Sequence, residues 1–172
     1  MQTILLQFWL KNVVSGHVVS KYEPTLELKN ERMKKLTMRI ITEIIIHCSA
    51  TPEGKDFHAS DIDRWHKAQG WRKIGYHYVI DLDGTVEKGR EDWEIGAHCL
   101  GHNENSIGIC YIGGMSRVGI PKDTRTDAQK YYMRELVEQL RKRYPLATVH
   151  GHREFARKAC PCFDVKTEYN EK

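Results

Sequence analysis

The residues best suited to chemistry gather late in the chain, in the run of residues 151–164. This short run contains His152, Lys158 and Cys160, so an imidazole, an ammonium and a thiol lie close together in the sequence. Imidazole and thiolate are borderline-soft ligands that suit zinc, and two of them make most of a catalytic zinc site. A third ligand must come from elsewhere, and His47, near the end of a strand-like apolar run, is a suitable candidate.

A catalytic zinc ion keeps three protein ligands and one open position, where its charge lowers the pKa of water to about 7. The spacing of His152 and Cys160 alone is only weakly specific for metal binding. Cys162 offers a second thiol nearby. It leaves open the alternative of a structural zinc, which normally has a fourth protein ligand.

The elements that must position these groups alternate between strands and helices. Apolar and β-branched runs indicate buried strands, and the turn at 81–84 indicates a hairpin. The predicted strands are residues 42–47, 75–80, 106–112 and 147–150. If the last strand continues as extended chain, His150 points away from the side on which His152 lies.

Two helices are predicted from capping residues and apolar periodicity. Ser60 is the expected N-cap of the first, which Gly70 ends, and Thr126 is the expected N-cap of the second, at about 127–143. The sequence therefore predicts an α/β fold in a single domain, with a mixed central β-sheet flanked by helices.

Composition excludes several classes of protein. The 172 residues, 40% of them hydrophobic, suit one domain with one core. The formal charge of +4 is mild, and no arginine-rich tract predicts nucleic-acid binding. No apolar run approaches the ~20 residues needed to span a bilayer, so a membrane span is not expected. We expect a monomer.

The five cysteines are an odd, scattered set, which disfavours a secreted disulfide framework. The first residues carry an apolar patch without a preceding positive region or a clear cleavage site, so no signal peptide is predicted. A cytoplasmic location with reduced thiols is the resulting expectation. Residues 1–37 lack a catalytic cluster and are interpreted as an N-terminal extension before a domain at 38–172. The extension is either a short arm packed on the domain or the result of a misassigned start codon.

Several blocks of sequence together resemble the zinc-dependent N-acetylmuramoyl-L-alanine amidases of the phage-lysozyme type. That family shares its fold with the peptidoglycan recognition proteins. The blocks are IHCSAT (46–51), WHKAQGW (65–71), IGYHY (74–78), DGTVE (83–87), GR (89–90), GAH (96–98), NENSIGI (103–109) and the run 151–164. They occur in the family's order, which is far more specific than any single block.

The resemblance implies that His47, His152 and Cys160 bind Zn²⁺, and that Tyr76 and Lys158 serve catalysis without binding metal. It implies hydrolysis of the amide between N-acetylmuramic acid and L-alanine in peptidoglycan. Negative charge that builds on the carbonyl oxygen would be stabilised by the metal, the ammonium and the phenol. The general base is not assigned, although a tyrosine-assisted water is preferred.

Three further residues are candidates for substrate contacts. His98 would face the substrate cleft or be hydrogen-bonded within the fold, two roles that the sequence does not separate. Asn103 and Trp71 could line a groove, and a core position is the alternative for Trp71. His66 and His77 are expected to pack, and His58 has no supporting context.

Two features depart from the family's pattern or compete with its function. Arg157 stands where many relatives carry proline, and Cys162 could misligate or oxidise against Cys160. The function expected is a phage or prophage wall-lytic enzyme, cytoplasmic until it reaches the cell wall. The alternatives are a non-catalytic peptidoglycan-binding module or a regulatory protein on the same fold. Stem-peptide specificity, export route and any protein partner are not indicated by the sequence.

Overall fold

The computed structural model describes Thr25 and residues 39–169 of the chain. The predicted N-terminal extension, apart from Thr25, lies outside the described residues. No helix in the described ranges is long and apolar enough to cross a bilayer.

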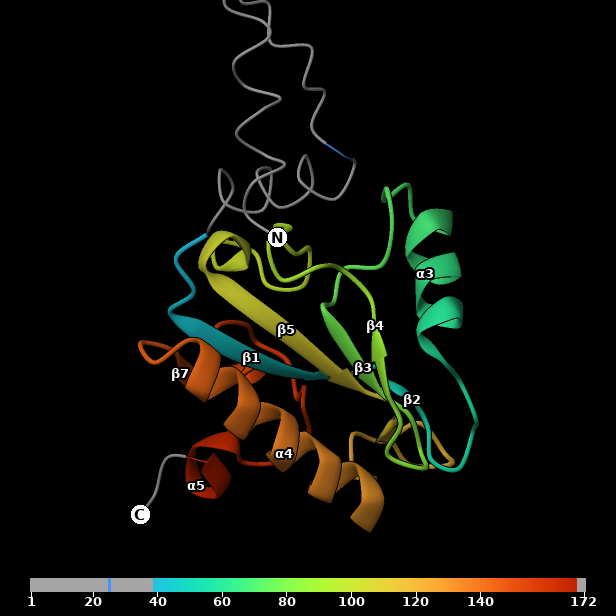
Figure 1. Cartoon of the computed structure of the whole chain (residues 1–172). Helices are drawn as coiled ribbons and strands as arrows, with labels where there is room; N and C mark the ends of the chain where they lie inside the picture. Colours follow the sequence, from blue (N-terminus) through green and yellow to red (C-terminus); the bar gives the residue numbers. More distant parts are fainter. Residues whose placement is uncertain (1–24, 26–38, 170–172) are drawn as a thin grey trace, which may run out of the picture. The chain divides into compact units, whose positions relative to one another are not determined.

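A five-stranded sheet forms the centre of the domain (Figure 1). Its strands, in spatial order, are β4 (Val86–Lys88), β3 (Tyr78–Ile80), β5 (Ser106–Tyr111), β1 (Glu43–Cys48) and β7 (Thr148–Gly151). Every neighbouring pair is parallel except β3 and β4, which form an antiparallel hairpin. A small second sheet pairs β2 (Thr51–Pro52) with β6 (Gly114–Met115). The mixed sheet predicted from the sequence is confirmed.

Strand β1 lies in the middle of the parallel part, between β5 and β7. Its residues Ile44, Ile45 and Ile46 are completely buried. A parallel strand covered on both faces has no solvent side, so a continuous apolar run is the expected pattern rather than alternation. This strand therefore forms a rigid platform for the residue that follows Ile46.

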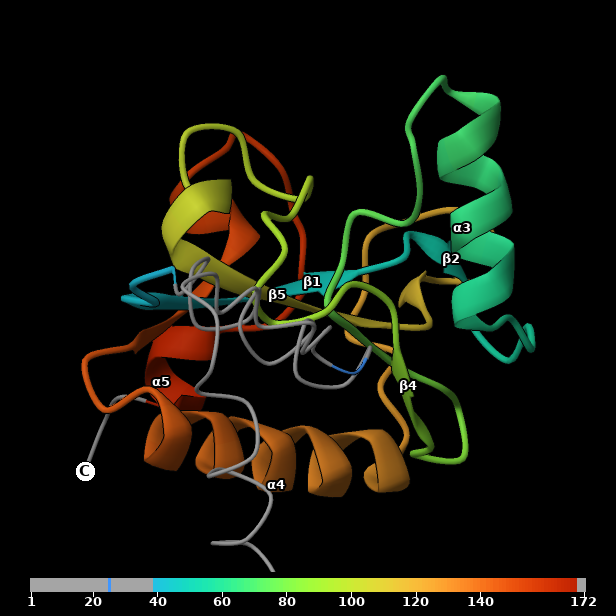
Figure 2. The same ribbon diagram turned by 45° about the horizontal axis from the view of Figure 1, so that its top comes forward.

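Helices cover the sheet on both sides. Figure 2 shows α4 (Asp127–Arg143) and α5 (Val165–Tyr169) below the sheet and α3 (Ala59–Ala68) above it, at one end. Thr126 caps α4 as predicted, since its side chain accepts the Gln129 backbone N–H at 3.0 Å. Two short 3₁₀ turns, η1 (Asn103–Asn105) and η2 (His152–Glu154), precede β5 and follow β7.

Two predicted element starts are wrong. Helix α3 begins at Ala59 with His58 as its N-cap, not Ser60, because the Asp61 carboxylate accepts the His58 N–H at 3.0 Å. Strand β3 begins at Tyr78 rather than at 75. The preceding Gly75 instead packs so closely that an added Cβ would lie 2.3 Å from the Ala97 carbonyl oxygen.

Candidate active site

His47 occupies the carboxyl end of β1, where its side chain is almost completely buried. Strand β7 runs parallel to β1, with Ile46 opposite Gly151, so His152 emerges beside His47. The two imidazole rings lie with centroids 4.4 Å apart. Carboxyl ends of parallel strands commonly carry the ligand sites of α/β folds, and two of the predicted ligands meet at this edge.

The loop after η2 brings Cys160 back to the same edge of the sheet. The Arg153 N–H donates to the Cys160 carbonyl oxygen at 2.7 Å, which closes the loop. The Cys160 Sγ lies 3.8 Å from His47 Nδ1 and accepts the Cys48 backbone N–H at 3.2 Å. The candidate ligand atoms of His47, His152 and Cys160 all lie within 4.8 Å of one another.

This donor set fits a zinc ion. Burial, with smaller contributions from the neighbouring His98, His152 and Lys158, lowers the pKa of His47, so its imidazole is neutral and free to ligate. The N–H that Cys48 donates to the Cys160 sulfur helps to hold that sulfur in place. Two imidazoles and one thiolate are a catalytic rather than a closed structural ligand set, because a fourth position remains.

His98 lies directly behind His47. Its Nδ1 is 3.0 Å from His47 Nε2, and its Nε2 is 3.3 Å from the Ser106 hydroxyl, which donates to the His102 carbonyl at 2.7 Å. The His98 residue is only 9% exposed. Such a partner fixes the ring orientation and leaves His47 Nδ1 directed toward Cys160.

The slot that holds the His98 ring is built from two glycines. A Cβ added to either Gly96 or Gly108 would lie 2.5 Å from the ring. The hydrogen-bonded role, which the sequence left open, is the one the structure shows.

Tyr76 and Lys158 approach the three candidate ligands from different segments. The Tyr76 ring centroid lies 5.2 Å from that of His47. Burial, with nearby thiols, raises the pKa of Tyr76, so its phenol stays protonated as a hydrogen-bond donor. Burial lowers the pKa of both His47 and His152, and the charge of the exposed Lys158 lowers both further.

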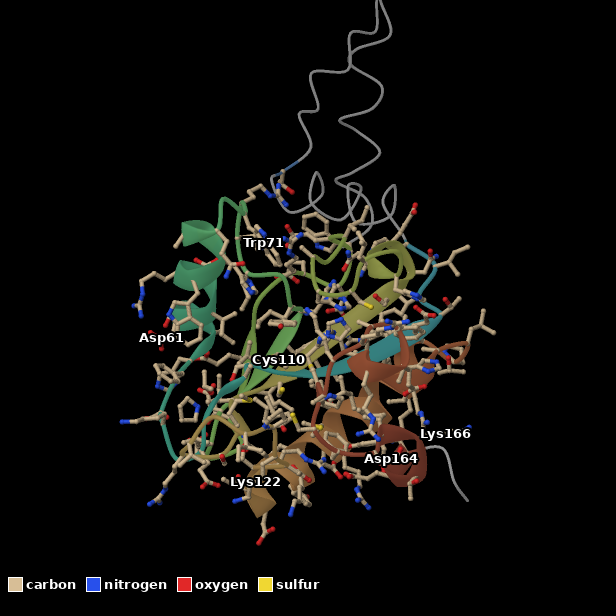
Figure 3. The ribbon with its side chains drawn as sticks, turned by 180° about the vertical axis from the view of Figure 1, so that it is seen from behind. Asp61, Trp71, Cys110, Lys122, Asp164 and Lys166 are labelled. Atoms are coloured by element: carbon tan, nitrogen blue, oxygen red, sulfur yellow. The ribbon has the colours of Figure 1, made fainter. Side chains whose placement is uncertain are left out.

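The two other predicted substrate residues differ in exposure. Trp71 is 37% exposed and lies in the segment after α3, with its ring 4.3 Å from that of His66 (Figure 3). Asn103 is partly buried, and its side-chain oxygen accepts the backbone N–H groups of His98 and Cys99 at 2.7 and 3.0 Å. Asn103 thus shapes the loop that carries His98, whereas Trp71 offers an accessible aromatic face.

The remaining thiol and imidazole near the site are engaged elsewhere. Cys162 Sγ lies 3.8 Å from Cys48 Sγ and 3.1 Å from the Gly114 carbonyl oxygen, and Cys162 does not belong to the metal-ligand cluster found among the described residues. His150 bonds to Thr148 and Glu154, as its position on the opposite side of the strand predicts. The structural-zinc alternative through Cys162 is therefore not supported.

Comparison with known proteins identifies the family. A sequence profile described as N-acetylmuramoyl-L-alanine amidase matches residues 37–163. The chain belongs to the N-acetylmuramoyl-L-alanine amidase family. This match confirms the amidase class predicted from the residue blocks.

The relatives include phage enzymes at substantial identity. The chain is 44% identical over 123 residues to the endolysin of Escherichia phage T7, covering 72% of this chain and 82% of that one. It is 42% identical over 125 residues to the endolysin of Klebsiella phage KP32, covering 73% and 83%. The amidase is therefore of the phage endolysin type.

Solved structures share the fold. The amidase LysC from Clostridium intestinale URNW matches with a TM-score of 0.66 at 25% identity, covering 78% of this chain and 88% of that one. Drosophila PGRP-LB matches with a TM-score of 0.61 at 27% identity, covering 72% and 76%. The peptidoglycan-recognition-protein-like fold predicted from the sequence is confirmed.

Proposed function

We propose that this amidase hydrolyses the bond between N-acetylmuramic acid and L-alanine with a zinc ion held by His47, His152 and Cys160. The observation that carries the proposal is the convergence of two imidazoles and a thiol within 4.8 Å at one sheet edge. Tyr76, which is not a member of that cluster, lies beside His47, and the charge of Lys158 acts on both histidines. A metal-ligand set with adjacent proton and charge donors is the arrangement that amide hydrolysis requires.

A bound zinc ion would act as a Lewis acid on the scissile carbonyl and would lower the pKa of water at its open position. The three ligands hold and orient that ion. His98 is hydrogen-bonded to His47 Nε2 and so leaves His47 Nδ1 facing the site, and the Cys48 N–H donates to the Cys160 sulfur. These contacts restrict the site to one geometry before substrate arrives.

Tyr76 and Lys158 act on charge and protons. The Lys158 ammonium stabilises the negative charge that develops on the carbonyl oxygen. The Tyr76 phenol, kept protonated by burial, donates a hydrogen bond to that oxygen or relays a proton to the leaving L-alanine amine. A tyrosine-assisted water is the preferred route for the general-base step, since no glutamate belongs to the metal-ligand cluster.

The biological setting follows from the relatives' names. We propose peptidoglycan as the substrate, with Trp71 and Asn103 lining the groove, and a monomer as the working form. Because its relatives are named endolysins, we propose wall lysis that follows release of this enzyme from the cytoplasm to the cell wall.

The decisive experiment measures release of new L-alanine amino termini from purified peptidoglycan. Release that a chelator abolishes and added zinc restores is the expected result. If one zinc ion is bound and wall binding is measurable but no termini appear, the non-catalytic recognition alternative is correct instead. That alternative is worth testing because several structural neighbours are peptidoglycan recognition proteins.

A further inference from the structure

A second group of metal-ligating side chains lies outside the active site. It consists of His58, the N-cap of α3, Asp81, which follows β3, and Glu87 in β4. One ligand atom from each lies within 4.8 Å of the others. His58 Nδ1 is 2.6 Å from Asp81 Oδ2. The group shares no residue with the His47, His152 and Cys160 cluster.

Asp81 provides an independent sign that a ligand is required. The residue is only 3% exposed, and its second carboxylate oxygen, Oδ1, is buried without a hydrogen-bond partner among the described residues. A buried carboxylate oxygen left unpaired is costly, typically by ~1–3 kcal/mol or more. Because Oδ1 belongs to the carboxylate that contacts His58, a cation bound in this group would satisfy it.

The charge around the group also calls for a cation. Burial raises the pKa of Asp81 most, and Glu87 and Asp83 raise it further, whereas the hydrogen bond and the charge of His58 lower it. Asp56 adds a fourth carboxylate, 3.9 Å from His58 Nε2. Within the part of the chain that the structure describes, no lysine or arginine forms an ion pair with Asp81 or Glu87.

Among the described residues, the positive groups that face the carboxylates are the His58 imidazole, whose pKa is raised by its hydrogen bond to Asp81, and the N-terminus of α3. There the Ala59 backbone N–H donates to Glu87 Oε2, which leaves the other Glu87 oxygen available for a ligand. A helix N-terminus carries only about half a positive charge, so it cannot balance two carboxylates. The group therefore keeps a net negative charge.

We infer that His58, Asp81 and Glu87 form a second divalent-cation site, separate from the catalytic centre. One imidazole with two carboxylates suits Zn²⁺ or Mn²⁺, whereas Ca²⁺ and Mg²⁺ prefer oxygen ligands alone. The His58 side chain is 47% exposed, so the ion can enter from solvent and complete its coordination with water. Bound there, the ion joins the start of α3 to the β3–β4 hairpin, which is a structural role.

The test counts zinc ions on the whole chain. Metal-free protein is dialysed against Zn²⁺ and the bound metal is measured by mass spectrometry. Wild type is expected to bind two equivalents, Glu87→Gln one, Cys160→Ser one, and the double variant none. Glu91→Gln, which removes a nearby exposed carboxylate outside the group, should still bind two.

A second measurement guards against a folding defect. His58→Gln removes the imidazole but keeps an N–H that can donate to Asp81, and it should also bind one equivalent. Zinc should raise the melting temperature of Cys160→Ser but not that of the double variant with Glu87→Gln. Mg²⁺ should have no such effect on either protein.

This design tests the second site and the catalytic site independently of each other. If Glu87→Gln and His58→Gln bind as much zinc as wild type, the second site does not exist, whatever Cys160→Ser shows. If only Cys160→Ser is unchanged, the proposed catalytic site is wrong while the second site stands. Loss of one equivalent in Glu87→Gln together with unchanged peptidoglycan hydrolysis is the result that supports the inference.

Discussion

Cys160 and Lys158 lie two positions apart on one loop but have separable tasks. Cys160→Ser should abolish activity and the binding of zinc at the catalytic site, because a hydroxyl is a much poorer zinc ligand than a thiolate. Lys158→Ala should keep the metal and lower the rate about 10²–10³-fold, the usual cost of losing one oxyanion-stabilising group. Zinc content and amino-terminal release, measured on each variant, check both statements.

Arg157→Ala is the matched control for Lys158→Ala, since it removes a neighbouring exposed cation that has no assigned role. It should retain most of the wild-type rate. Full turnover by Lys158→Ala would show that its assigned role is wrong.

Substitution of His98 should lower the affinity for zinc more than it lowers the stability of the fold. Its ring is hydrogen-bonded to His47, and loss of such a partner typically weakens metal binding 10–100-fold. We expect His98→Ala to lower zinc affinity by about this factor in competition with a chromophoric chelator. His150→Ala, which removes an imidazole from the other side of the strand, should leave the affinity unchanged. Equal affinities for the two variants would contradict the positioning role.

At the scale of elements, Asp92 connects the hairpin to the end of α4. Tyr78 of β3 donates to Asp92 Oδ1 at 2.7 Å, and Arg143 and Tyr144 donate to Oδ2 at 2.8 and 2.9 Å. Lys88 of β4 also contacts the carboxylate. Burial alone would raise the pKa of Asp92, but these hydrogen bonds lower it from 3.8 to about 2.

This depressed pKa makes stability depend on pH. The stabilisation that ionised Asp92 contributes is fully present above pH 3.8, the pKa of this carboxyl in the unfolded chain. It is lost as the pH falls through about 2, the pKa in the folded protein. A shift of this size corresponds to about 2 kcal/mol of unfolding free energy. Asp92→Asn should therefore lower stability by about that amount at pH 7, and the difference from wild type should shrink between pH 4 and 2. Urea denaturation of both proteins from pH 7 to pH 2 measures this difference in stability.

Asp127→Asn provides the comparison, because its carboxylate is fully exposed and its removal should change stability little at either pH. A constant difference between Asp92→Asn and wild type from pH 7 to pH 2 would argue against the ionised carboxylate as the cause.

For the whole molecule, the sequence predicted the elements whose signals are local. The apolar run that became β1 and the cap and periodicity of α4 each lie within one stretch of chain. The start of α3 was missed because the Asp61 carboxylate accepts the His58 N–H, and Glu87 of the distant hairpin accepts the Ala59 N–H as well. The role of His98 depends on glycines at 96 and 108 that form a slot only after folding.

The second metal-ligand group was missed for the same reason. His58 has no informative neighbours in sequence, and its partners Asp81 and Glu87 come from another element. By contrast, His47, His152 and Cys160 could be predicted to lie together because the resemblance supplied pairings that residue spacing alone could not, and their candidate ligand atoms do lie within 4.8 Å of one another.

Chelation should remove the catalytic metal without unfolding the domain. The core rests on the buried isoleucines of the sheet and on the apolar face of α4, not on the metal. We expect unchanged far-ultraviolet circular dichroism after chelation. A melting temperature lower by on the order of 10 °C is also expected, because a ligand at 1,000 times its Kd adds about 4 kcal/mol. Loss of the dichroism signal on chelation would show instead that the metal is needed for folding.

The separation of the ligands along the chain has a consequence for biosynthesis. Cys160 lies 113 residues after His47, and β1 pairs with β7 only when both have been made. A ribosome-bound or prematurely terminated chain that stops before Cys160 holds an incomplete donor set. With the proposed ligand set, hydrolytic competence would therefore arise in one late step, after the ends of the domain have met, and partial translation products would be inert toward the wall.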